Sequence, residues 1–576
     1  MAKPPETKRR RRNGSIAIRA VWAIPILAFV TLGLGAWGWL SYGIEPADAL
    51  YRAVGLLDNN NDTYGSGAGL HDWRFRVGRW TGAMVVFSTA LLALGTLLQQ
   101  RVSTTLARRT KQTVVIIGGD PLATTAFEAA QESHRSALWL GAPAFGSTNL
   151  RTIALPWPPQ ERAQAVIDHA AGSDHVLVAH EDDAEALTLA RAARLTAPDA
   201  HITVLMRDVR LAEDAGATLN EAKTRVLSQA AVAARALTIA HPPFLIARDH
   251  HQERIHALII GFGQTGQAIA RDLIVNCRTT YLAIPHLTVI DPQAKALEGV
   301  LRVRAPEVDA CAQSQFIQGE ISGRAVHPDP KVIAKAIAEA GPITAAYVCL
   351  STDVEALSAA ATLQSLLRSI DLDSPPIFVR VRELNTIAPA GQADRGLDAL
   401  IPFGDLASIL TSSEFLSNAP DAAARAFVEA YRASLTPEQR DNPANRSARA
   451  WDELDETYRQ NARDAVAHIA AKLASAGVNP GRWRWVTGVP RLGPDDRLFS
   501  DAAQLEALSE LEHERWNAQR RMDGWRWADI PAKNEARRLH QSLVEYADLS
   551  DDVKEYDRVM VRQTQAACGG EGSDAL

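Results

Sequence analysis

Two long runs of hydrophobic residues stand near the N-terminus of the chain. Val21–Leu40 contains twenty residues and Trp80–Leu98 contains nineteen, and neither run includes a charged residue. A helix that rises 1.5 Å per residue spans roughly 30 Å in each case, which matches the hydrocarbon core of a bilayer. Trp22 and Trp39 lie near the ends of the first run and Trp80 opens the second, as aromatic residues at membrane interfaces do. The pattern predicts two transmembrane helices.

The flanking residues predict the orientation of this hairpin. A cleaved signal peptide is the alternative for the first run, but its apolar region is too long, no small-residue cleavage site follows, and a second run comes soon after. Basic residues in Lys8–Arg12 precede the first run, and others in Arg101–Lys111 follow the second. Because basic residues favour the cytoplasmic side, we expect both termini in the cytoplasm and two spans in the cell inner membrane. Arg52 and Arg74–Arg79 in the connecting loop weaken this contrast.

The loop between the two runs contains one short amphipathic stretch. Residues 46–57, PADALYRAVGLL, place Pro46 early and apolar residues on one side, which predicts a short helix. A helix between two spans is the plan of a pore-loop channel, but the TVGYG-like run of a potassium filter is missing. Only Val54-Gly55 and the TYGSG of residues 63–67 share parts of that run. Two interpretations stay open, a re-entrant pore helix and an ordinary periplasmic loop.

After the second run, short β-branched segments alternate with helical ones. Residues 112–120, QTVVIIGGD, predict a strand that enters a glycine turn, and a helical stretch follows. Residues 174–208 predict a strand, an acidic turn, a helix and another strand. Such alternation implies a parallel sheet. The first turn reads GGDPLA and lacks the spaced glycines of a dinucleotide site, which favours a structural turn over nucleotide binding in this unit.

The same pattern begins again with a complete glycine motif, IHALIIGFGQTGQAIARDLI. Gly261 permits the tight turn, Gly263 lets a pyrophosphate approach the backbone, and Gly266 lets helix and strand pack closely. Asp291 ends the next predicted strand, where it would meet a ribose hydroxyl, although the gap from Gly261 exceeds the usual spacing of about 20 residues. This second unit predicts binding of NAD(H) or another adenine nucleotide, with a purely structural turn as the alternative.

Composition and charge narrow the class of protein. The formal net charge of -6 over 576 residues lacks the basic excess that is typical of nucleic-acid-binding proteins, so we expect no nucleic-acid partner. Four cysteines without a CxxC spacing argue against a disulfide framework and a zinc site, and they fit a reducing cytosol. Because HExxH, GxSxG and a P-loop lysine are all missing from the sequence, we name no catalytic residue and no metal ligand.

The last part of the chain changes to a helical pattern that is rich in Trp and Tyr. Residues 423–478 predict two helical stretches around a polar loop, and Gln504–Met522 predicts a long helix. Gly524 ends this helix as a C-cap, and Trp525 and Trp527 follow it. Indole faces suit a base, and the donors of nearby His and Arg residues suit a phosphate. The structural alternative is that the aromatic residues form the core of a small helical domain.

A membrane hairpin followed by tandem Rossmann units resembles the regulator-of-potassium-conductance (RCK) arrangement, which is also described as TrkA-N-like. DHVLVAHEDDAEALTLARAARL, residues 174–195, is similar to the segment after the fourth strand of that family. IIGFGQTGQAIA and LTVIDP, within residues 259–292, resemble its nucleotide motif. The resemblance covers roughly residues 112–405. It implies cytosolic domains that bind a nucleotide or an ion and pull on pore helices, usually as symmetric oligomers.

A second resemblance concerns the C-terminal helices. The pattern HERW, GW, LVEYADL and EYDR, between His513 and Arg558, resembles the RyR domain, the repeat named after ryanodine receptors. WDELDETYRQNAR, residues 451–463, looks like the segment that accompanies bacterial RyR domains. The resemblance permits a sensor role with a small nucleotide-like ligand. The candidate ligand residues in this domain are His513, Arg515, Trp516, Trp525 and Tyr546.

The predicted fold class is a membrane helical hairpin plus α/β, in which tandem Rossmann-like parallel sheets are followed by a mainly α-helical RyR-type domain. The predicted divisions are a basic cytosolic N-terminus (1–20), a two-helix transmembrane unit (21–98), a first Rossmann unit (112–250), a second (254–412), a helical accessory region (420–500) and the RyR domain (501–565). The predicted function is that of a ligand-regulated membrane protein, a potassium or other cation channel or transport regulator. Its expected partners are the bilayer, a nucleotide-like ligand, potassium ion and further copies of the chain. A non-conducting membrane-anchored sensor or scaffold and an NAD(P)-dependent oxidoreductase are the alternatives.

Overall fold

The fold is taken from a computed structural model of the chain. The structure describes residues 11–57, 72–109, 113–119, 121–132, 136–141, 151–156, 159–218, 223–370, 375–382, 400–404, 421–442, 445–486, 489–492 and 496–568. The chain divides into two compact units. The first comprises Met1–Lys111 and Leu140–Leu155, and the second comprises Gln112–Trp139 and Pro156–Leu576.

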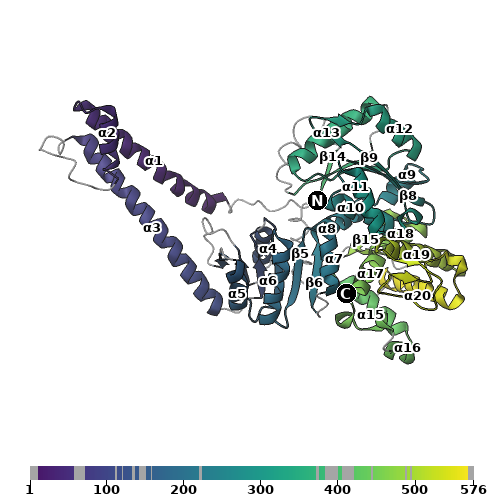
Figure 1. Cartoon of the computed structure of the whole chain (residues 1–576). Coiled ribbons are helices and arrows are strands. Elements are labelled where there is room, and N and C mark those ends of the chain that lie inside the picture. The colour runs from purple at the N-terminus through teal and green to yellow at the C-terminus, as the bar shows by residue number, and fades with distance from the viewer. Residues whose placement is uncertain are drawn as a thin grey trace. The chain divides into compact units, whose positions relative to one another are not determined.

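Three helices make up most of the first unit. α1 (Arg11–Ser41) and α3 (Trp73–Arg109) lie side by side, and α2 (Pro46–Val54) packs against α1 near their connection (Figure 1). Pro46 takes the first position of α2, where a missing backbone N–H leaves no hydrogen bond unmade. The structure therefore confirms the short helix expected within residues 46–57. The TYGSG run at residues 63–67 lies outside the described residues.

Glycines allow the three helices of the first unit to approach closely. A Cβ added to Gly35 of α1 would lie 2.6 Å from Leu56 Cδ1, and one added to Gly82 of α3 would lie 2.4 Å from the Leu56 carbonyl oxygen. Thr31 Oγ1 donates a hydrogen bond of 2.8 Å to Thr81 Oγ1 across the same interface. Small residues and interhelical hydrogen bonds of this kind are typical of helix packing within membranes.

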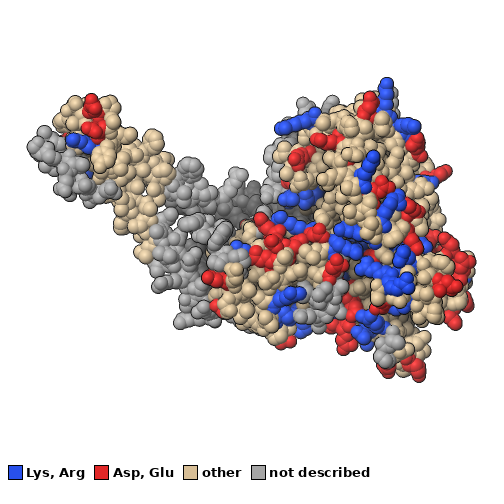
Figure 2. Space-filling model, in the orientation of Figure 1, with Lys and Arg blue, Asp and Glu red and all other residues tan. Residues whose placement is uncertain are grey.

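The outward faces of α1 and α3 carry large apolar side chains. Phe29 is 81% exposed, Phe87 is 68% exposed and Trp80 is 76% exposed. Figure 2 shows uncharged side chains along the described parts of these two helices, with charged groups gathered near α2. Exposed apolar surface of this extent is suited to contact with lipid or with another apolar chain rather than with water.

Two helical stretches among the described residues are long and apolar enough to cross a membrane, Ile24–Ser41 and Gln229–Asp249. The first overlaps the predicted span Val21–Leu40. The second consists of α8 (Gln229–Ala240) and α9 (Pro243–Asp249), and both helices contribute buried residues to the hydrophobic core of the second unit. We therefore assign Gln229–Asp249 to the core of an α/β domain.

The other predicted span, Trp80–Leu98, lies within the single helix α3. The side chains of residues 92–93 and 95–98 are outside the described part of the chain. This second span therefore stays a prediction, supported by the helical backbone and by the exposed apolar residues that precede residue 92.

The first sheet has six strands in the order β3-β2-β1-β4-β5-β6. Its strands are β1 (Val114–Ile117), β2 (Ala137–Leu140), β3 (Thr152–Ile153), β4 (His175–Ala179), β5 (His201–Met206) and β6 (Thr224–Ser228). Its helices are α4 (Pro121–Glu132), α5 (Pro159–His169), α6 (Asp183–Thr196) and α7 (Val209–Thr218). The pairs β1–β4, β4–β5 and β5–β6 are parallel. This order, which reverses at β1, defines a doubly wound Rossmann-like sheet.

The second sheet repeats the same order, read as β9-β8-β7-β12-β13-β14, and all five of its strand pairs are parallel. Its strands are β7 (Arg254–Ile260), β8 (Ala283–Asp291), β9 (Gln313–Gln318), β12 (Ala345–Val348), β13 (Ile377–Arg380) and β14 (Leu400–Phe403). Its helices are α10 (Gln264–Asn276), α11 (Ala294–Arg304), α12 (Pro330–Ala340) and α13 (Asp353–Ser369). A short antiparallel hairpin, β10 (Glu320–Ile321) with β11 (Val326–His327), interrupts the alternation. The two sheets confirm the predicted tandem Rossmann-like fold.

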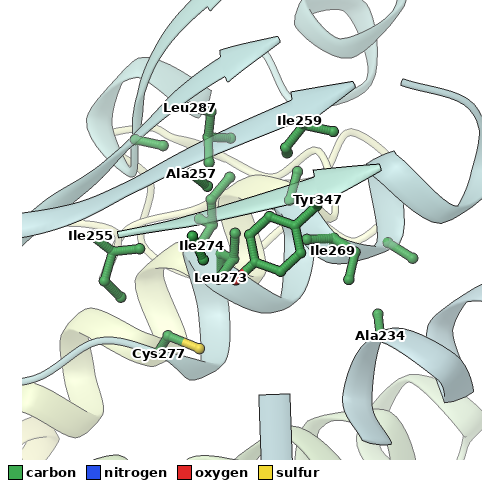
Figure 3. Packing of buried hydrophobic residues seen from close by; sticks show 14 of the residues in the cluster. Ala234, Ile255, Ala257, Ile259, Ile269, Leu273, Ile274, Cys277, Leu287 and Tyr347 are labelled. Atoms are coloured by element: carbon green, nitrogen blue, oxygen red, sulfur yellow. The ribbon is translucent and has the colours of Figure 1, made fainter. Parts of the chain in front are cut away.

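The core of the second sheet extends into the neighbouring helices. Tyr347 of β12 is buried, and Figure 3 shows its ring beside Ile269 and Leu273 of α10. Ala234 of α8 belongs to the same hydrophobic cluster. The same hydrophobic cluster includes Ala518, which lies in the C-terminal part of the chain. Continuous burial of apolar area across these elements favours one cooperative block over independently mobile domains.

The remaining residues form a mainly helical region, as expected. Its helices are α15 (Ala422–Ser434), α16 (Pro437–Asp441), α17 (Glu456–Ala467), α18 (Ile469–Ser475), α19 (Ala502–Met522) and α20 (Asp551–Cys568). Its short strand pairs are β15 (Arg484–Val486) with β16 (Val489–Arg491) and β17 (Arg526–Trp527) with β18 (Leu539–His540). The Asp501 side chain accepts a hydrogen bond from the Gln504 amide and starts α19. Gly524, at a φ of 85°, follows the end of that helix, where its sequence position predicted a stop.

Candidate functional site

The glycine turn of the second Rossmann unit is held in a shape that needs glycine at two positions. Gly261 has a φ of 87°, and a Cβ there would lie 3.0 Å from the Cys349 carbonyl oxygen and 2.9 Å from Leu350 Cδ2. A Cβ on Gly266 would lie 2.3 Å from the Gly261 carbonyl oxygen. The first glycine is therefore required by backbone conformation, and the third by the close approach of α10 to β7.

Gly263 has a different environment. It precedes α10 as the N-cap residue in an extended conformation that any residue could adopt, with a φ of -69°. No heavy atom lies within 4 Å of a Cβ added at this position. The N-terminus of α10 therefore faces open space, where its free amide groups and the helix dipole favour an anion.

Asp291 lies beside the same turn, at the end of β8. Its Oδ2 accepts a 2.8 Å hydrogen bond from the Phe262 amide, and its Oδ1 accepts a 2.7 Å hydrogen bond from the Gln293 amide. Each carboxylate oxygen has a second lone pair for a hydroxyl donor. The structure thus brings Gly261, Gly263 and Asp291 together. The long spacing in sequence is taken up by the segment after α10 and by the nine residues of β8.

One basic residue that was not among the candidates, Arg380, lies close to this turn. Arg380, at the end of β13, donates a hydrogen bond of 3.1 Å to the carbonyl of Leu350, whose Cδ2 would lie 2.9 Å from a Cβ added to Gly261. Burial lowers the pKa of Arg380, and repulsion from Arg382 lowers it further. A basic group is favourable beside an anion at this edge of the sheet. Its place at the carboxyl end of a predicted parallel strand could have indicated it, because the carboxyl ends of parallel strands lie at the same edge of the sheet.

The turn also contacts the first Rossmann unit. Gln264, the first residue of α10, donates a 2.8 Å hydrogen bond from Nε2 to Asp208 Oδ2. Its Oε1 accepts a 2.9 Å hydrogen bond from the Val209 amide. A ligand at Gly263 would therefore lie next to a residue that joins the two sheets.

The corresponding turn of the first Rossmann unit is closed. Gly118 has a φ of 136°, and an added Cβ would lie 1.7 Å from the Ala179 carbonyl oxygen. The buried Trp139 of β2 donates a 2.7 Å hydrogen bond from its indole to the Gly118 carbonyl. A large indole thus packs beside this turn on the neighbouring strand, where the second unit carries Asp291. This geometry favours the interpretation that this glycine turn is structural and does not bind a nucleotide.

Two of the candidate ligand residues in the C-terminal domain lie in its interior. Arg515 is fully buried, and its guanidinium donates to Glu512 at 2.9 Å and to Gln519 Oε1 at 3.0 Å. His513 is also buried, with Nδ1 3.1 Å from Asp557 Oδ2 and Nε2 3.1 Å from the carbonyl of the neighbouring Val544. The donors of both side chains are directed to protein groups.

Two of the three aromatic candidates, Trp516 and Trp525, contact the ring of His540, whereas Tyr546 lies against His513. The His540 ring lies edge-on to Trp516 at 5.0 Å and to Trp525 at 5.9 Å between ring centroids. Tyr546 is buried, and its hydroxyl donates a 3.0 Å hydrogen bond to Glu506. Burial lowers the pKa of His540 to about 4, so this ring is neutral at pH 7. His540 was not among the candidate residues, because it lies far along the chain from the helix that carries Trp516.

A buried charged cluster joins the accessory helices to α19. Glu512 contacts Lys472 of α18, with 2.7 Å between Nζ and Oε2, and it also pairs with Arg515. These three side chains and His468 are all buried. Although burial alone would raise the pKa of Glu512, Arg515 and Lys472 hold it well below its usual range. The cluster fixes α18 against α19 through charge pairing.

Comparisons with known proteins agree with parts of this picture. Residues 500–569 match the family model of the RyR domain, which confirms the resemblance for that segment. No curated protein matches the chain.

Solved structures with similar arrangements include two of GsuK. The GsuK structure bound to ADP has 15% identity and a TM-score of 0.37, covering 70% of this chain and 98% of that one. The GsuK channel bound to NAD has 12% identity and a TM-score of 0.35, covering 71% and 84%. The A chain of dipicolinate synthase from Bacillus subtilis has 13% identity and a TM-score of 0.20, covering 54% and 95%. All three TM-scores lie below 0.5, and the fold assignment stands on the strand orders described above.

Proposed function

We propose that this chain is a nucleotide-regulated membrane protein, a potassium or other cation channel or a transport regulator. Its two N-terminal spans cross the cell inner membrane with both termini in the cytoplasm. The tandem Rossmann units and the RyR-type domain lie in the cytoplasm and bind the regulatory ligand. The domain divisions proposed from the sequence are kept, because each Rossmann-like sheet lies within one of them.

One observation carries the proposal, the geometry of the glycine turn at Gly261–Gly266. The backbone requires glycine at Gly261 and Gly266, whereas Gly263 borders open space at the start of α10. A turn with a purely structural purpose has no need of glycine at Gly263. A pyrophosphate that approaches the backbone there does need it, because a side chain would occupy the same space. Asp291 lies beside the turn for the ribose, so NAD(H) or another adenine nucleotide is the proposed ligand.

The membrane role is supported by the first unit. α1 combines a membrane-length apolar stretch, Ile24–Ser41, with outward-facing side chains such as Phe29. A second helix, α3, packs closely on it through Gly82. Two spans are too few to enclose a pore, so ion conduction requires several copies of the chain. We therefore propose a homo-oligomer in which α2 is the pore-side helix.

Regulation follows from contacts next to the proposed nucleotide. A ligand alters an equilibrium between two arrangements only through its difference in affinity for them. Gln264 lies next to Gly263 and contacts Asp208 and Val209 of the first Rossmann unit. A nucleotide that prefers one geometry of this contact would favour one arrangement of the two Rossmann units, which the membrane helices would follow.

The test compares Gly263→Ala with Gly299→Ala in the full chain purified in detergent. Both positions have open space around an added Cβ, so neither substitution should disturb the fold. NAD and ADP should each raise the Tm of the wild type and of Gly299→Ala, and isothermal titration should show binding at least tenfold weaker to Gly263→Ala. Equal affinity of Gly263→Ala and wild type for both nucleotides would exclude this turn as the regulatory site.

A further inference from the structure

A cavity of about 620 Å³ lies within the second unit, and one of its walls is α10, the helix that follows the glycine turn. Its walls come from β6, α7 and α8 of the first Rossmann unit, from α10 of the second, from α15 and α17, and from the end of α19 and the segment after it. Gly261, Gly263 and Asp291 are not among its lining residues. The volume falls within the range of small-molecule sites, roughly 300–1,000 Å³.

Basic side chains line much of this cavity, and most of them have protein partners. Arg271 contacts Asp464 and Asp523, each at 3.2 Å. Lys533 donates a hydrogen bond of 2.8 Å to the hydroxyl of Tyr458. In Figure 2, Lys and Arg side chains gather over α17 and α19 on the face of this unit. The wall therefore has a positive character that is largely balanced by local pairing.

Arg520 is the exception. Its side chain lines the cavity and is only 7% exposed, yet it makes no hydrogen bond or ion pair with any residue that the structure describes. Its guanidinium lies 5.7 Å from the ring centroid of Trp516 and 5.3 Å from that of Trp525. Cation–π contacts compensate only part of the cost of burying a charge without an anion. An anionic ligand would supply the missing partner through a bidentate hydrogen bond.

Aromatic groups line the cavity beside this guanidinium. Trp525, His540 and Tyr458 all contribute to the wall. Since His540 is neutral at pH 7, these rings offer flat, uncharged surfaces rather than a second cationic site. Flat rings next to an unpaired guanidinium suit a ligand that combines a planar base with a phosphate.

We propose that this cavity is a second ligand site, which binds a nucleoside phosphate with its phosphate on Arg520 and its base against Trp525 and His540. The site rests on an observation that is independent of the glycine turn. Because its walls belong to both Rossmann units and to the RyR-type domain, an occupied cavity would hold these parts together. In this site Trp525, one of the candidate residues found from the sequence, contacts the ligand directly. Trp516 contacts the Arg520 guanidinium through a cation–π interaction.

The experiment uses the full chain in detergent with Gly263→Ala as the background, so that binding at the glycine turn does not contribute. The probes are AMP, adenosine and inorganic phosphate, each titrated by calorimetry. AMP should bind, and adenosine and phosphate should each bind at least tenfold more weakly. Adding Arg520→Gln should weaken AMP binding at least tenfold, whereas Arg537→Gln, at an exposed arginine of the same segment, should leave it unchanged.

The thermal stability of the ligand-free variants separates a binding role from a structural one. Arg520→Gln removes a buried charge that lacks an anionic partner, so its Tm should equal or exceed that of Arg537→Gln. The proposal is overturned if none of the probes binds in an Arg520-dependent way. It is also overturned if Arg520→Gln lowers the Tm by more than about 5 °C while AMP affinity stays the same, because Arg520 would then be a structural residue.

Discussion

The buried cluster around Glu512 gives a stability prediction that can be worked from the structure. Glu512 is 1% exposed and pairs with two cations, Lys472 at 2.7 Å and Arg515 at 2.9 Å, both fully buried. Glu512→Gln keeps the size and hydrogen-bonding capacity of the side chain but removes its charge. Two buried cations then lose their only close carboxylate among the described residues. Breaking a buried ion pair in this way costs about 3–5 kcal/mol.

This cost is a large share of the total stability of a typical domain, roughly 5–15 kcal/mol. A loss of 1 kcal/mol lowers the Tm of a domain of about 150–250 residues by about 2–4 °C, so the Tm should fall by roughly 10 °C. Solvent screening reduces the effect little, since the cluster is almost fully buried. Thermal unfolding of the purified chain, followed by tryptophan fluorescence, measures the change.

The control is Glu510→Gln, two residues earlier on the same helix and exposed. Surface substitutions of this kind change stability by at most about 0.5 kcal/mol, so its Tm should match that of the wild type. If Glu512→Gln unfolds within about 1 °C of Glu510→Gln, the carboxylate does not stabilise the two cations, and the electrostatic account of the α18–α19 contact is wrong.

Two further predictions concern the buried histidine and the helix packing of the first unit. Burial lowers the pKa of His468 to about 4, so the unfolded chain binds a proton more tightly than the folded one between pH 6.5 and 4. The free energy of unfolding should therefore decrease as the pH is lowered through this window, by about 2–3 kcal/mol at pH 4.5 relative to neutral pH. Urea denaturation should show a smaller decrease in His468→Gln. Gly82→Leu would place a side chain against the Leu56 carbonyl, so ion flux should be lost while nucleotide titration is unchanged. Undiminished flux in that variant would show that close packing at Gly82 is not needed.

The elements of the Rossmann units could be predicted because their signals are local. The strand ending at Ile260, the turn at Gly261 and the helix from Gln264 follow one another, and each is specified by its own residue types. The same holds for the end of α19 at Gly524. Asp291 could also be placed, because it ends the strand next to the turn.

The side-chain environments could not be predicted in the same way. Arg515 is a charged residue in a helical pattern that also suits a solvated face, and its burial depends on Glu512 and on Asn461 from another helix. Arg380 donates a hydrogen bond to Leu350, beside the glycine turn, from a strand more than one hundred residues further along the chain than the turn. The cavity at Arg520 has walls from segments spread between Val209 and His540, which only the folded chain brings together.

The most direct test of the account is potassium flux from liposomes that contain the purified full-length protein, measured with and without NAD or ADP. The account predicts that nucleotide changes the flux through the wild type and leaves the flux through Gly263→Ala unchanged. A wild-type protein that binds nucleotide through Gly263 but carries no flux, or the same flux in both conditions, would contradict the claim that the glycine turn controls the membrane unit.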